Sequence, residues 1–208
     1  MLPVSLKIFL PFIFSLFNSS LLFKAEDKKP ANDFKWAVGS MSTLKVSGKS
    51  NVNSFTCAIT SYRGPDTLYC EDDRGSGKPV RLKGVLEINM NQFDCKNKMI
   101  TNDFRKTVRV KEDPNLQVRF LSLSQLPSFG KNAQCIKGMV EVKLAGVAKI
   151  VEIQYGFVKS EGDSFTMTGK TSFCFSDFQL SPPKKLAGII VIEDEFTVEF
   201  NLALSLVS

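Results

Sequence analysis

The chain has 208 residues, enough for one domain with a sizeable apolar core, and carries a formal net charge of +6 at pH 7. It contains no histidine, which excludes a Ser-His-Asp or Cys-His catalytic system and a zinc site built on imidazole. No segment combines a basic patch with interleaved aromatic residues, so we expect no nucleic-acid partner, although a weak attraction to anionic membrane surfaces stays open.

The N-terminal segment has the pattern of a secretory signal peptide. Lys7 precedes an apolar run over residues 8–17. The alternative is a single membrane anchor, but Pro11 and the polar residues 18–20 interrupt the run before it reaches the about 20 apolar residues of a span. We therefore predict a signal peptide over residues 1–25, export to the periplasm or out of the cell, and a soluble mature product.

A polar leader over residues 26–33 precedes one predicted domain over residues 34–208. In that domain apolar and polar residues alternate, the pattern of β-strands with one buried face. The alternation recurs over residues 42–48, 81–91, 117–123, 135–146, 148–158, 164–173 and 196–206. Turns rich in Gly, Pro, Asp and Ser separate these segments, which indicates an antiparallel meander.

One segment breaks the alternation. Ile100, Phe104 and Val108 are spaced four residues apart, which predicts a short amphipathic helix that ends before Asp113 and Pro114. In an otherwise all-β chain, such a helix plugs one end of the structure or gates it.

A sheet of about eight strands must curl, pair with itself or close into a barrel. Closure removes the exposed edges and leaves room for side chains or for one ligand. The strand over residues 196–206 spans about 36 Å at the usual rise per residue, which favours a tilted barrel wall over the strands of a β-sandwich. We predict an all-β, antiparallel barrel of about eight strands with one short helix, with a sandwich as the alternative.

The cysteines show no metal-ligand spacing, so we predict neither a metal site nor a cofactor. An exported chain favours disulfides, and an odd number of cysteines leaves at least one thiol outside them. Spacing alone does not fix the pairing. We favour Cys57 with Cys95, because both lie at the ends of neighbouring predicted strands. The five cysteines are Cys57, Cys70, Cys95, Cys135 and Cys174.

We predict no enzymatic activity. The acidic runs at residues 71–73 and 193–195 read as turns, since neither is enclosed by apolar residues that would raise the pKa of a carboxyl group. An enzyme would have to rely on these carboxylates or on a free thiol, such as Cys70 or Cys174.

Four segments in order carry a resemblance to a known family: LKVSGKSNVNSFTC, LEINMNQFDCKNKMITNDF, VEVKLAGVAKIVEI and GKTSFCFSDFQLSPPKKLAGIIVIEDEFTVEFNLAL. Together they resemble the YceI-like family, in the form common in exported proteins of Bacteroidota. The chain departs from that pattern where Asp113-Pro114 replaces a Tyr-Pro pair and where β-branched residues enter the helix. The resemblance implies a lipocalin-like barrel, periplasmic or secreted, that holds an isoprenoid or other lipid chain and has no catalytic residues.

The composition suits that role, because 18 phenylalanines against one tryptophan and three tyrosines make an interior with few hydrogen-bonding groups. We predict non-enzymatic binding of a long-chain lipid, polyisoprenoid or fatty-acid-like, by a carrier, sensor or store of the cell envelope. The alternative is a solid barrel or sandwich that acts as a structural or protein-interaction module. The oligomeric state stays open. The residues predicted to line the interior are Trp36, Leu44, Val46, Phe55, Leu86, Ile88, Met90, Phe120, Val140, Val142, Ile153, Tyr155, Phe165, Met167, Phe196, Val198, Phe200 and Leu202.

Overall fold

A computed structural model describes residues 33–71, 79–128, 133–160, 162–185 and 189–207. The predicted signal peptide (1–25) and all of the predicted leader except Asp33 lie outside this part of the chain. The elements are β1 (Phe34–Val38), β2 (Thr43–Ser50), β3 (Ser54–Ile59), β4 (Thr67–Glu71), β5 (Val80–Asn89), η1 (Met90–Gln92), α1 (Lys98–Thr107), β6 (Asn115–Leu123), β7 (Gln134–Leu144), β8 (Val147–Lys159), β9 (Ser164–Cys174), η2 (Phe175–Phe178), β10 (Lys184–Lys185) and β11 (Ile190–Leu206).

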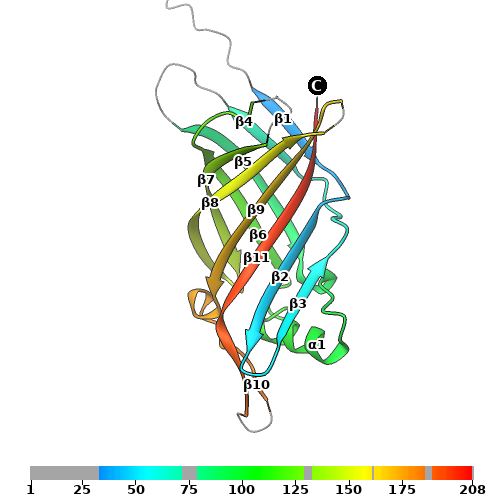
Figure 1. Ribbon diagram of the computed structural model, residues 1–208, viewed down its shortest axis with the longest axis vertical. Helices are drawn as coiled ribbons and strands as arrows, with labels where there is room; N and C mark the ends of the chain where they lie inside the picture. Colours follow the sequence, from blue (N-terminus) through cyan, green and yellow to red (C-terminus); the bar gives the residue numbers. More distant parts are fainter. Residues whose placement is uncertain (1–32, 72–78, 129–132, 161, 186–188, 208) are drawn as a thin grey trace, which may run out of the picture.

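The strands close into an antiparallel barrel (Figure 1). The ring runs β1-β4-β5-β6-β7-β8-β9-β11 and returns to β1, which pairs with both β4 and β11. The prediction of an all-β, lipocalin-like barrel of about eight strands with one helix is therefore confirmed, and the sandwich alternative is wrong. The physical reason is that closure pairs the two strands that would otherwise form open edges.

The long strand β11 has two partners along one edge. Its first part pairs with β2 and its last residues pair with β1, while β9 follows it along the other edge. The side chain of Ser42 supports the change of partner, because its Oγ accepts a hydrogen bond from the Ala203 amide at 3.0 Å. The hairpin of β2 and β3 thus extends the barrel wall towards α1 (Figure 1).

The helix α1 lies at the end of the barrel away from β1 and β4 (Figure 1). It begins after Asn97, whose side-chain oxygen accepts hydrogen bonds from the amides of Met99 and Ile100, a standard N-cap arrangement. Its residue Phe104 is buried. The predicted helix is therefore present. It covers one end of the barrel together with η2, and we call this end the helix end.

A hydrogen bond links the two segments at the helix end. The Arg109 guanidinium donates to the carbonyl oxygen of Gln179 at 2.9 Å. Both residues have left-handed backbone conformations, which end α1 and η2 in turns. No helix among the described residues is long and apolar enough to cross a bilayer.

The opposite end of the barrel is filled by protein side chains. Trp36 of β1 pairs with Leu68 of β4 and with Leu206 of β11, and the Trp36 and Leu68 side chains are fully buried. Leu82 and Leu123 are buried beside them in the same core. We call this the packed end.

Charged residues lie on the outer face of the wall. Glu199 of β11 forms ion pairs with Lys45 of β2 at 2.5 Å and with Lys170 of β9 at 3.0 Å. The three residues stand side by side across neighbouring strands. The alternation of lysine with apolar residues thus separates a solvated outer face from an apolar interior.

Candidate functional site

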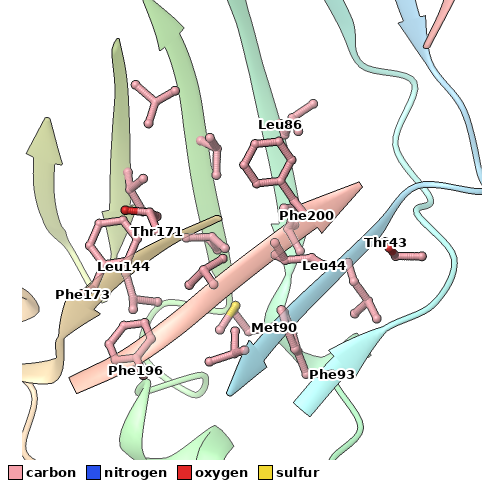
Figure 2. A pocket seen from close by; sticks show the side chains of 18 of the residues that line it. Thr43, Leu44, Leu86, Met90, Phe93, Leu144, Thr171, Phe173, Phe196 and Phe200 are labelled. Atoms are coloured by element: carbon pink, nitrogen blue, oxygen red, sulfur yellow. The ribbon is translucent and has the colours of Figure 1, made fainter. Parts of the chain in front are cut away.

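An apolar cavity lies inside the barrel between the packed end and the helix end (Figure 2). Its free volume is about 90 Å³, which would hold about six to nine water molecules. Water needs polar partners, and the lining is almost wholly hydrocarbon. The space therefore suits an apolar guest better than solvent.

The strands bring most of the predicted interior residues to this cavity, because alternate side chains of each strand point inward. Figure 2 shows Leu44, Leu86, Met90, Phe196 and Phe200 converging from β2, β5, η1 and β11. The predicted residues that line the cavity are Leu44, Val46, Leu86, Ile88, Met90, Phe120, Val140, Val142, Ile153, Tyr155, Phe196, Val198, Phe200 and Leu202.

Four predicted residues lie elsewhere. Trp36, Phe165 and Met167 are buried but line no part of the cavity. They belong to the same buried apolar core as the lining residues. Phe55 of β3 is half-buried against Gly48, past the helix end of the cavity.

Several aromatic residues at the helix end line the cavity although they were not among the predicted interior residues. Phe93 precedes α1, Phe104 belongs to it, and Phe175 and Phe178 belong to η2. None of the four lies in a strand, so alternation does not reveal them. The spacing from Ile100 to Val108 marks Phe104 as an apolar helix residue, and the density of aromatic residues in FCFSDF is the available signal for Phe175 and Phe178.

Inward side chains of β11 retain some accessible surface. Val198 and Phe200 line the cavity and are only half-buried, as is Val118 of β6. The Phe200 ring lies over Gly169 of β9, where an added Cβ would overlap it. Glycine at that position lets the ring lie against the wall and keeps the centre of the barrel open.

The cavity carries no formal charge among the described residues that line it. The Tyr62 hydroxyl donates a hydrogen bond to Asp66, and burial, with help from this carboxylate, raises the pKa of Tyr62. The Tyr155 hydroxyl is buried with no hydrogen-bond partner among the described residues, and burial raises its pKa as well. Both phenols are thus neutral at physiological pH, and the lining offers no acid or base.

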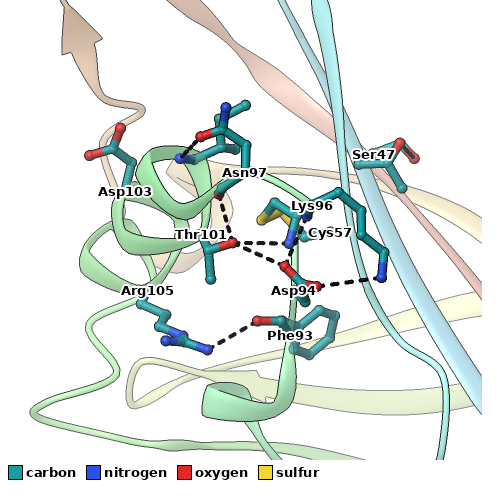
Figure 3. The surroundings of a disulfide bond; sticks show 12 residues. Ser47, Cys57, Phe93, Asp94, Lys96, Asn97, Thr101, Asp103 and Arg105 are labelled. Atoms are coloured by element: carbon teal, nitrogen blue, oxygen red, sulfur yellow. Dashed lines mark hydrogen bonds and ion pairs between the residues drawn. A yellow bond between two sulfur atoms is a disulfide. The ribbon is translucent and has the colours of Figure 1, made fainter.

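A disulfide joins Cys57 of β3 to Cys95, just before α1 (Figure 3). Beside it, Ala58 and Asp94 exchange two backbone hydrogen bonds at 3.0 Å. Thr101 of α1 accepts a hydrogen bond from the Cys95 amide at 3.1 Å. These contacts fix the start of α1 to the barrel wall.

The Asp94 carboxylate strengthens this corner of the structure (Figure 3). A hydrogen bond from the Lys96 amide lowers the pKa of Asp94, and the Lys96 ammonium lies 3.5 Å away. The other cysteines, Cys70, Cys135 and Cys174, form no disulfide in the described part of the chain. No group of side chains there is arranged to hold a metal ion.

No family model and no curated protein matches the chain. Several solved structures are similar to it. BcnA from Burkholderia cenocepacia is 17% identical, with a TM-score of 0.58 over 78% of this chain and 95% of that one. A polyisoprenoid-binding domain from Saccharophagus degradans, implicated in plant cell wall breakdown, is 14% identical, with a TM-score of 0.58 over 83% and 98%.

The third structure is a YCEI protein from Campylobacter jejuni, 12% identical, with a TM-score of 0.52 over 77% of this chain and 85% of that one. At these identities the likeness establishes a shared fold. The resemblance to the YceI-like family, stated from the sequence, is therefore confirmed at the level of the fold.

Proposed function

We propose that this chain, which has the YceI-like fold, binds one long-chain lipid of isoprenoid or fatty-acid type inside its barrel, without catalysing a reaction. The observation that carries the proposal is the uncharged, hydrocarbon-lined cavity between the packed end and the helix end. The polyisoprenoid binding named for the S. degradans domain supports the choice of ligand class.

The driving force is the transfer of hydrocarbon out of water. Each buried methylene contributes about 0.8 kcal/mol, so ten contribute about 8 kcal/mol before ordering costs, enough for about micromolar affinity at best. Met90 lines the cavity, and its unbranched side chain can shift to admit more of the lipid's hydrocarbon chain. The phenylalanine rings offer no polar group that a hydrocarbon would leave unpaired.

Export is part of the proposal. Residues 1–25 would direct the chain to the periplasm or out of the cell, where it carries, senses or stores the lipid. The disulfide between Cys57 and Cys95 supports this assignment, because such bonds persist in oxidising compartments.

The test is direct detection of the ligand. Purified protein is extracted with organic solvent, the extract is analysed by mass spectrometry, and the delipidated protein is titrated with a polyprenol. We expect a co-purified lipid near one per chain and saturable rebinding. Absence of both would refute the proposal and favour a structural or protein-interaction module.

A further inference from the structure

A second hollow of about 410 Å³ lies outside the barrel, at its helix end. It is a groove between α1, the β2–β3 hairpin and the start of β11, segments that lie close together in Figure 1. Most of the described residues that line it are apolar, among them Phe55, Ile100 and Ile192. Met99 of α1 and Val52 of the hairpin stand on the same wall and are 69% and 61% exposed. Hydrocarbon that covered this surface would remove it from water.

The inner cavity is too small for the whole of a long lipid chain. Its volume of about 90 Å³ corresponds to about six to nine water molecules, and so to about as many methylene groups, which are of similar size. A chain of about twenty carbons would therefore leave more than half of its length outside the cavity.

The two ends of the barrel differ in the space that they offer to this remainder. At the packed end the side chains of Leu68, Leu82 and Leu123 are fully buried, so the described residues close the barrel there. At the helix end the cavity borders the groove, because the two hollows share lining residues. The remainder of the chain therefore finds apolar surface only a short way beyond the helix end of the cavity.

Two aromatic rings separate the cavity from the groove. Phe104 of α1 and Phe175 of η2 line both hollows. Phe104 packs against Phe93 with ring centroids 5.3 Å apart, and Phe175 packs against Phe196 at 4.7 Å. Loss of one such ring pair costs about as much as one or two buried methylenes contribute. A chain that buries about four methylenes in the groove would offset the displacement of either ring.

We propose that Phe104 and Phe175 form a gate through which the bound chain leaves the barrel, and that the carbons beyond the capacity of the cavity lie in the groove. The inference rests on the proposed function. The groove then acts as a second binding site for the same ligand and makes the affinity rise with chain length after the cavity is full. Without the groove, the additional carbons would stay in water and add nothing to the affinity.

The test compares two alcohols of different length, geraniol (C10) and geranylgeraniol (C20), titrated into the delipidated protein. Geraniol is about long enough to fill the cavity. We expect geranylgeraniol to bind at least about tenfold more tightly, the effect of about four methylenes buried in the groove less the two that offset the displaced ring. A smaller difference would overturn this inference and leave the proposed function standing. If neither alcohol binds, the proposed function fails and the inference fails with it.

A larger side chain in the groove locates the additional carbons. Ile100→Trp would fill part of the groove, so it should weaken geranylgeraniol binding about tenfold and leave geraniol binding unchanged. If Ile100→Trp does not fold, Met99→Trp enlarges an exposed side chain on the same wall. The matched control is Ile150→Trp, because Ile150 is 59% exposed on the outer face of β8, and this change should alter neither affinity. An unchanged preference for the longer alcohol in a folded groove variant, or equal weakening of both alcohols, would contradict the proposed gate.

Discussion

Replacing Val142 by phenylalanine tests whether the cavity is real space. Val142 lines the cavity from β7, so the larger side chain would point into the free volume. The change adds four carbon atoms, whose burial contributes about 3 kcal/mol at about 0.8 kcal/mol each. Overpacking a filled core costs about 1 to 3 kcal/mol. Where free volume receives the ring, the gain from burial offsets the cost of fitting the ring, and we expect the free energy of unfolding to change by less than about 1 kcal/mol.

The same ring should exclude the ligand. If it displaces four methylenes of the bound chain, the dissociation constant rises by about 100-fold, which corresponds to the same 3 kcal/mol. The assays are urea denaturation and titration with a polyprenol. Lys143→Phe, one residue along on the outer face, is the control and should leave binding intact. A loss of more than about 1 kcal/mol in unfolding free energy, the cost of overpacking a filled core, or unchanged binding would refute the reasoning.

Three further changes probe the site and its support. Phe200→Asp would place an unpaired carboxylate in the cavity, so it should abolish lipid binding and lower the free energy of unfolding in urea by about 3 kcal/mol. The control Asn201→Asp, on the outer face, should do neither. Equal behaviour of the two variants would contradict an inward Phe200. Replacing Cys57 and Cys95 by serine should lower the free energy of unfolding by about 4 kcal/mol, because the disulfide closes a loop over 38 residues. A reductant should lower the stability of the native protein by the same amount. If neither treatment changes the stability, the disulfide is contradicted. Tyr155→Phe removes a buried hydroxyl that has no partner in the described structure, so thermal denaturation should show unchanged or raised stability; a clear loss would mean that the hydroxyl is paired.

Strand alternation in the sequence predicts the barrel well, because one buried face per strand fixes which side chains point inward. On that basis Val140, Val142 and Phe196 are predicted to lie in the interior, and they line the cavity. Alternation does not say how far along the barrel a residue lies. Trp36 and Met167 are buried as expected but line no part of the cavity.

The helix end is where the sequence is least informative. The spacing of Ile100 and Phe104 predicts α1, but the meeting of that helix with η2 depends on contacts between segments far apart in the chain. The Arg109–Gln179 hydrogen bond spans 70 residues and has no local signature.

The most direct test of the account is the position of a bound chain inside the protein. Nuclear Overhauser effects between a ¹³C-labelled polyprenol and protein methyl groups would report it. We predict contacts with Val140, Val142 and Leu202 in the cavity and none with Leu68 or Leu82 in the packed end. Contacts confined to surface methyls, or no contacts at saturating ligand, would contradict a lipid held within the barrel.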